Sequence, residues 1–254
     1  TIMCMTIYCT GLNSSVGNLL NQDDELKLEP ILTKTNRTSR NMIFQNPSKL
    51  LKEDDYLIHI AWNMDKRDLE SSYNINVDGA RQLIDNLNND QKKRFIFMST
   101  INASDKSKSI YEQHKYEVEN YVLEKGGYVI KCGLIYNSED KFQFGFINSL
   151  YQMAKKFPLI PNFSGNSSIY YLTSDHELKN LILKIVNSND LYLQKNNKCF
   201  SLGPISFETL VREVMAIDKR IVKIPWIVGY VTSKLLEKLN INFPIKSDSM
   251  MAIK

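Results

Sequence analysis

Short apolar runs alternate with longer polar stretches through the first half of the chain. The apolar runs have the length of single buried strands and lie at residues 3–9, 30–33, 56–61, 95–98 and 128–131. Between them, residues 16–21, 76–87 and 111–125 are predicted to be helices. The apolar face expected for 76–87 consists of Val77, Ala80, Leu83, Ile84 and Leu87. Continuous apolar strands separated by helices predict an α/β fold, a Rossmann-type, doubly wound parallel sheet covered on both faces.

The pattern is looser after residue 136. Helices are predicted at 142–157, 174–187, 207–215 and 225–239, and 158–168 is predicted to be a loop. We therefore predict a Rossmann-type domain at 1–140 and a small, mostly helical lobe at 141–254, on the carboxyl edge of the sheet where such folds hold their ligands. The segment 225–236 is amphipathic enough for a membrane surface, but we expect it to be buried against the lobe. Residues 36–49 are expected to form a polar loop.

The composition is that of an ordinary globular protein and excludes several kinds of partner. The 254 residues are 43% hydrophobic and 24% charged, which suits one large domain or two small ones. The net charge of +4, from 32 basic and 28 acidic residues, is dispersed and gives no case for nucleic-acid binding. No apolar run has transmembrane length and no signal peptide is recognisable, so we expect no membrane partner. The scattered cysteines are expected to be reduced thiols of a cytoplasmic protein, with no metal site; they are Cys4, Cys9, Cys132 and Cys199.

A candidate phosphate-binding turn directly follows the first predicted strand and precedes a helix. Its sequence is Thr10-Gly11-Leu12-Asn13-Ser14-Ser15-Val16-Gly17. Gly11 permits a tight turn, Gly17 permits close packing of helix on strand, and the helix N-terminus presents N–H groups to a pyrophosphate. Ser14 stands where the usual motif has its middle glycine, so its side chain either obstructs the phosphates or donates to them. The alternative interpretation is a strand-to-helix turn without a ligand.

The end of the second predicted strand lacks the acidic residue that would bind the ribose hydroxyls of NAD. Basic residues stand there instead, Lys34 and Arg37, with Arg40 slightly further on. Their charge suits the 2′-phosphate of NADP, which favours NADP over NAD, although NAD stays open. The alternative is that these residues are only the charges of a surface loop.

Tyr111 and Lys115 are the candidate catalytic pair. The spacing Tyr-x-x-x-Lys occurs four times in the chain, but only this pair follows an apolar strand that ends in Ser99-Thr100. Residues four apart on a helix share a face, so the ammonium lies near the phenol and favours its ionised form. The pair is then a general acid/base. The alternative is a solvated Tyr and Lys on a surface helix.

Several segments, in order, resemble the extended short-chain dehydrogenase/reductase superfamily, in its nucleotide-sugar epimerase/dehydratase and reductase branch. The segments that carry the resemblance are TGLNSSVG, DDYLIHIAW, NVDGARQLIDNL, RFIFMST, YEQHKYEVE, VIKCGLIYN and IYYLTSDHELKNLIL. They span most of the chain. The resemblance implies an NAD(P)-dependent reductase or epimerase acting on a nucleotide-activated sugar, in cell-surface polysaccharide biosynthesis. A homodimer through a helix pair is common in this family and stays open here.

The resemblance also implies roles for individual residues. Tyr111 is the expected proton donor or acceptor, Lys115 lowers the pKa of Tyr111 and binds the nicotinamide ribose, and Ser99 or Thr100 hydrogen-bonds the substrate oxygen. The expected cofactor-binding residues are Thr10, Gly11, Ser14, Ser15, Val16, Gly17, Lys34, Arg37, Ala61, Lys115 and Cys132. His59 is expected to be a satisfied core histidine, and Trp62 to pack without contacting the cofactor. Because Ser14 and the missing ribose acid depart from the family pattern, the alternative function is an NADP-binding module that acts through a protein partner.

Overall fold

The computed structural model describes most of the chain, and two compact units are distinguished within it. The described residues are 5–22, 26–31, 33–35, 42–44, 47–63, 69–139, 142, 145–163, 169–188 and 194–239. The first unit comprises 1–103, 114–131 and 179–199, and the second comprises 104–113, 132–178 and 200–254. The division therefore differs from a single boundary at residue 140, since 179–199 returns to the first unit and 104–113 belongs to the second.

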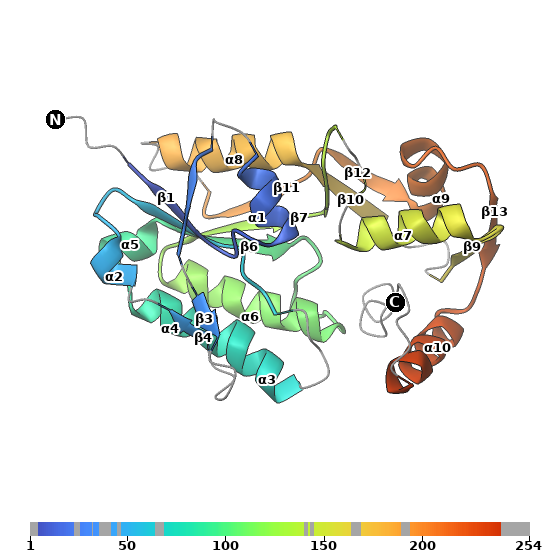
Figure 1. Cartoon of the computed structure of the whole chain (residues 1–254), viewed down its shortest axis with the longest axis horizontal. Coiled ribbons are helices and arrows are strands. Elements are labelled where there is room, and N and C mark those ends of the chain that lie inside the picture. Colours follow the sequence, from blue (N-terminus) through green and yellow to red (C-terminus); the bar gives the residue numbers. More distant parts are fainter. Residues whose placement is uncertain are drawn as a thin grey trace. The chain divides into compact units, whose positions relative to one another are not determined.

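A six-stranded sheet forms the first unit and confirms the Rossmann-type fold (Figure 1). Its strands, in spatial order, are β11 (Asn196–Cys199), β7 (Tyr128–Cys132), β6 (Phe95–Thr100), β5 (Tyr56–His59), β1 (Ile7–Thr10) and β2 (Leu28–Pro30). β1 pairs in parallel with β2 and with β5, and β5 pairs in parallel with β6. The chain passes from β1 to one side for β2 and to the other side for β5. This is the topological switch point at which open α/β sheets hold their ligands.

Helices cover both faces of this sheet. Figure 1 shows α1 (Ser15–Leu20) on one face and α4 (Gly79–Asp85) and α6 (Ile110–Glu124) on the other. The face predicted for 76–87 is confirmed, because all five of its apolar residues are at most 3% exposed. They pack with Leu57, Phe95, Phe97, Val118, Val122 and Val129 in one core cluster. The helix predicted there begins as a π-helical turn, Asn74–Asp78, before α4.

Several smaller elements of the first unit differ from the predictions. β2 ends at Pro30, and the chain then forms a hairpin of β3 (Thr33–Thr35) with β4 (Met42–Phe44). A short helix, α2 (Pro47–Leu50), follows. The expectation of a loop throughout 36–49 is therefore wrong for β4 and α2. The remaining helices that lie wholly or mainly in this unit are α3 (Leu69–Tyr73), α5 (Asn89–Lys93) and α8 (Asp175–Asn187).

The second unit contains the helices predicted for the C-terminal half, except the one at 174–187 (α8), and more strand than was predicted. Its helices are α7 (Gly145–Lys156), α9 (Phe207–Thr209), which continues as a π-helical turn over Leu210–Val214, and α10 (Trp226–Lys238). Three strands form one small sheet, in the order β12 (Leu202–Ser206), β10 (Ile169–Ser174), β8 (Leu134–Tyr136). β9 (Leu159–Asn162) pairs in parallel with β13 (Arg220–Lys223), so the loop predicted at 158–168 contains a strand. The core of this unit includes Phe142, Ile147, Leu150, Leu172 and Phe207.

Candidate active site

Two glycines shape the turn between β1 and α1 because no side chain fits at either position. Gly11 has a φ of 78°, and a Cβ there would lie 2.6 Å from the backbone nitrogen of Ala61. A Cβ at Gly17 would lie 2.4 Å from the carbonyl oxygen of Gly11. The first contact brings the ends of β1 and β5 together, and the second brings α1 onto the turn. The structure thus has the tight strand-to-helix turn that the sequence predicts, with Ala61 against it.

Ser14 is the N-cap of α1. Its hydroxyl accepts a hydrogen bond from the Gly17 N–H at 3.1 Å, which satisfies one of the amides at the start of the helix. Ser15 and Val16 are the first two helical residues, whose N–H groups point out of the helix end with no intrahelical acceptor. Ser14 therefore occupies one amide of the turn and leaves two for an anion. This geometry fits a pyrophosphate group at the turn.

A buried histidine connects the carboxyl ends of β1 and β5. His59 Nδ1 lies 2.7 Å from the hydroxyl of Thr10, and the Ala61 N–H donates to the Thr10 carbonyl oxygen at 3.1 Å. Burial, followed by the charge of Lys115, lowers the pKa of His59 to about 3. His59 also stacks on Phe97, with ring centroids 5.9 Å apart. The prediction of a satisfied core histidine is confirmed, and its partner Thr10 belongs to the predicted cofactor turn.

The side chains predicted to bind a 2′-phosphate are outside the described part of the structure. Lys34 is in β3, in the segment directly after β2, and nothing is described of its side chain. Arg37 and Arg40 lie outside the described residues. The preference for NADP therefore stays a prediction.

The end of β6 is tied to α6 and β7 by a buried ionic network. Glu119 is 2% exposed; it accepts a short hydrogen bond from the Ser99 hydroxyl and pairs with the Lys131 ammonium at 2.8 Å. Lys131 also donates to the Ala103 carbonyl oxygen at 2.7 Å. Burial raises the pKa of Glu119, and the hydrogen bonds from Lys131 and Ser99 oppose this rise. The network fixes β6 and the three residues that follow it.

This network distinguishes the two hydroxyls proposed for catalysis. The Ser99 side chain donates to Glu119 on the helix side of β6. Successive side chains of a strand point to opposite faces, so the Thr100 side chain leaves β6 on the other side. Thr100 is partly exposed, whereas Ser99 is 7% exposed. The Ser99 hydroxyl is thus committed to Glu119, whereas the Thr100 hydroxyl is partly exposed on the other face.

Lys115 is buried on α6 against the same strand. Its ammonium donates to the Met98 carbonyl oxygen at 2.6 Å and lies 3.9 Å from the centroid of the Trp62 ring and 4.6 Å from that of Phe97. Lys115 is 4% exposed. Trp62 therefore covers a charged group instead of only filling space. The arrangement holds a cation beside β6 at Met98, two residues before the strand ends at Thr100.

Tyr111 lies one turn before Lys115 on α6, within the segment assigned to the second unit. Part of its side chain reaches the surface, yet the protein surrounds the phenol closely enough for burial to raise its pKa. Cys132 and Glu112 add to this rise. The expected direction, a pKa lowered by Lys115, is therefore wrong for this structure. The phenol is protonated at neutral pH, which is the form that donates a proton. Cys132 itself is 2% exposed at the end of β7.

Sequence reasoning missed two polar residues that support these positions. Glu119 lies eight residues after Tyr111 on the same helix. The sequence pattern does not indicate that its carboxylate is buried and paired with Lys131. Asn76 accepts from the Asn63 N–H at 2.7 Å and donates to the Asn63 carbonyl oxygen at 3.0 Å, which fixes the chain just after Trp62. The signal for Asn76 was present: a polar residue next to the apolar face of a predicted helix.

No family model matches the chain, and a search of curated protein sequences gives no match. Solved structures do match it. The dTDP-4-dehydrorhamnose reductase of Bacillus anthracis, in complex with NADP, is 15% identical with a TM-score of 0.65, over 98% of either chain. The UDP-glucose 4-epimerase of Thermotoga maritima, with UDP-glucose, is 16% identical with a TM-score of 0.60, over 98% of this chain and 97% of that one. The UDP-glucuronic acid 4-epimerase of Bacillus cereus, in complex with NAD, is 14% identical with a TM-score of 0.61, over 87% and 88%. At these identities the likeness establishes the fold, which is the Rossmann-type α/β fold of these reductases and epimerases.

Proposed function

We propose that this chain is an NAD(P)-dependent reductase or epimerase of the extended short-chain dehydrogenase/reductase superfamily, acting on a nucleotide-activated sugar. The observation that carries the proposal is the contact of α6 with β6. Lys115 donates to Met98 and so holds the helix that bears Tyr111 against the strand that ends in Thr100. The glycine turn after β1, at the switch point of the same sheet, supports a dinucleotide site.

The glycine turn suits the pyrophosphate, and the basic residues after β2 suit a 2′-phosphate. The amides of Ser15 and Val16, the glycine backbone at Gly11 and Gly17, and Thr10 and Ala61 at the strand ends make up the proposed cofactor site. Lys34 and Arg37 are the proposed ligands of the 2′-phosphate, which makes NADP the expected cofactor and leaves NAD as the other choice. Cys132 is proposed to flank this site. When bound, the nicotinamide supplies or accepts the hydride.

The protein's own groups supply the proton and the position of the substrate. Tyr111, protonated at neutral pH, would donate its proton to the carbonyl oxygen of a keto sugar. Thr100 donates a hydrogen bond to the same oxygen, and Lys115 is proposed to bind the nicotinamide ribose. The pathway proposed for such a product is the synthesis of cell-surface polysaccharide.

Replacing Tyr111 with phenylalanine tests the proposal. NADPH consumption would be followed with dTDP-4-dehydro sugars, and epimerisation with UDP-glucose and UDP-glucuronic acid. Tyr111→Phe is expected to lower turnover about 10²–10⁴-fold and to leave NADPH binding nearly unchanged. Tyr121→Phe is the matched control, because Tyr121 has the same spacing to a lysine on the same helix but donates to Asp85 at 2.5 Å on the surface. Equal turnover in the wild type and Tyr111→Phe would contradict the assigned role.

A second function is favoured by the surroundings of Ser14 and Lys115. Ser14 occupies the Gly17 amide, and Lys115 already donates to Met98 under the cover of Trp62. Both features suit a module that binds NADP and acts through a protein partner without turnover. That module predicts saturable NADPH binding and no hydride transfer with any sugar nucleotide. Turnover that depends on Tyr111 would rule it out.

A further inference from the structure

The exposed face of α10 carries a stripe of aliphatic residues. Four of its large aliphatic residues, and the residue that follows the helix, are 47–60% exposed: Ile227, Val228, Val231, Leu235 and Leu239. At 3.6 residues per turn these positions fall within about 120° of the helix circumference. This contradicts the expectation that the segment is buried against the lobe. Single exposed aliphatic residues are ordinary, but a continuous stripe of them marks a surface that binds something apolar.

The side of α10 that is buried has small residues instead. Gly229 and Ser233, one turn apart, are its buried residues. Tyr230 packs against the core cluster of the second unit, which fastens the helix to that unit. The helix is thus held by its small residues and one aromatic ring, while the aliphatic residues of the stripe face outward. Since burial of the aliphatic side would be the more stabilising choice for an isolated domain, the outward stripe points to an external ligand.

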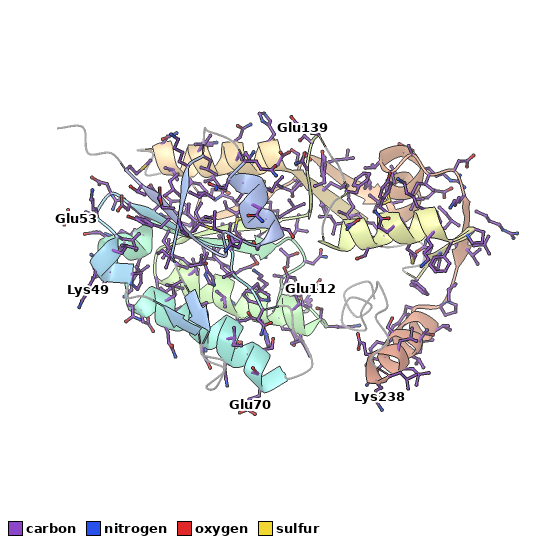
Figure 2. The ribbon with its side chains drawn as sticks, viewed as in Figure 1. Lys49, Glu53, Glu70, Glu112, Glu139 and Lys238 are labelled. Carbon is purple, nitrogen blue, oxygen red and sulfur yellow. The ribbon has the colours of Figure 1, made fainter. Side chains whose placement is uncertain are left out.

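The charges around this stripe are mainly basic. Lys234 borders it, whereas Lys238 falls within it at the last turn of the helix; Figure 2 shows Lys238 at the far end of α10. Arg220 and Lys223, on the strand before the helix, are exposed as well. From residue 220 to residue 239 there are four basic residues and one acidic residue, Glu237. An aliphatic stripe accompanied by lysines has the chemistry of a helix that lies in the interface of an anionic membrane.

We propose that α10 binds an anionic lipid surface, with its aliphatic stripe among the acyl chains and its lysines at the phosphates. A helix of 13 residues is about 20 Å long, too short for a hydrocarbon core of about 30 Å. Among the described residues no helix is long and apolar enough to cross a bilayer. The helix therefore lies in the plane of the surface.

Vesicle co-sedimentation of the whole chain tests the proposal. We expect binding to vesicles of phosphatidylglycerol and phosphatidylcholine, weakened by salt, and little binding to vesicles of phosphatidylcholine alone. The double variant Val231→Gln, Leu235→Gln should bind about 10²-fold more weakly, because two aliphatic side chains are lost from the acyl region. Lys234→Gln with Lys238→Gln should remove much of the preference for the anionic vesicles.

The control is Ile169→Gln, which removes an equally exposed aliphatic residue from β10 of the same unit and should leave vesicle binding unchanged. Circular dichroism and thermal unfolding would verify that every variant is folded, as expected for exposed positions. Absence of binding to anionic vesicles would overturn the proposal. It would also be overturned if light scattering showed a dimer that the Val231→Gln, Leu235→Gln variant dissociates, since the stripe would then join two copies.

Discussion

The hydroxyls of Ser99 and Thr100 leave β6 on opposite faces, so neighbouring residues receive different roles. Ser99→Ala removes a donor from the buried carboxylate of Glu119, which is expected to lower the free energy of unfolding by about 1–3 kcal/mol. Thr100→Val removes the proposed donor to the substrate oxygen and should lower kcat about 10²-fold with little change in stability. Chemical denaturation would measure the stability of both variants, and steady-state kinetics would measure their kcat. A larger loss of kcat in Ser99→Ala would reverse the assignment.

Glycine is required at Gly11 for two reasons: its φ is positive, and the backbone of Ala61 passes too close to leave room for a Cβ. Gly11→Ala places a Cβ 2.6 Å from the Ala61 nitrogen, so the ends of β1 and β5 must separate and NADPH binding should be lost. Gly126 has a similar φ of 83°, but the nearest atom to its Cβ would be a lysine side-chain carbon at 3.7 Å. Gly126→Ala should therefore cost only about 1–2 kcal/mol and keep NADPH binding. Thermal unfolding and NADPH titration would compare them, and equal behaviour of the two variants would refute the close-approach argument.

His59 predicts how stability changes with pH. Its folded pKa of about 3 is below the unfolded value of 6.5, so the unfolded state binds the extra proton between these values. The free energy of unfolding should therefore fall as pH decreases from 6.5 toward 3, by about 1.4 kcal/mol per pH unit from this residue. Denaturation at several pH values would measure the slope. His59→Asn, which can keep the hydrogen bond to Thr10, should reduce it. An unchanged slope in His59→Asn would contradict the buried neutral histidine.

At the scale of elements, α6 joins the proposed acid, the buried cation and the ionic network in one helix. Removing one partner of the Glu119–Lys131 pair, as in Lys131→Met, should lower the free energy of unfolding by about 3–5 kcal/mol because a buried charge is left alone. The double variant Glu119→Leu, Lys131→Met should recover much of this loss. Asp54→Asn, which breaks the surface pair of Asp54 with Arg94 at 3.3 Å, should cost at most about 1 kcal/mol. If denaturation curves gave equal losses of stability for Lys131→Met and Asp54→Asn, the burial of the Glu119–Lys131 pair would be contradicted.

Elements with strong periodicity could be predicted from the sequence, and those set by distant contacts could not. The strands at β1, β5, β6 and β7 and the helices α4 and α6 follow from apolar runs and from one apolar face, which tertiary packing completes. The segment of β9 was predicted to be a loop because it contains a proline. Its pairing with β13 joins residues some sixty positions apart, and local sequence does not show such a contact. The candidate site divides in the same way. The Tyr-x-x-x-Lys spacing predicts a shared helix face, but the hydrogen bonds that commit Ser99 to Glu119 and Lys115 to Met98 depend on tertiary packing.

At the scale of the whole molecule, the chain passes between its two compact units several times. The boundary between the units crosses α6 between Gln113 and His114, so the proposed acid Tyr111 and the cation Lys115 belong to different units although they share a helix. The sequence pattern predicted one crossing near residue 140, because a change in local periodicity does not show a later return such as that of 179–199.

A titration of the purified protein with NADPH and with NADH, followed by nicotinamide fluorescence, tests the central claim most directly. The account predicts saturable micromolar binding of NADPH, weaker binding of NADH, and a loss of the difference in Lys34→Ala. Tyr111→Phe should bind NADPH as the wild type does, which separates the cofactor site from the proposed chemistry. Absence of binding of either nucleotide, in protein shown to be folded, would contradict the assignment of a dinucleotide site to the turn at Gly11–Gly17.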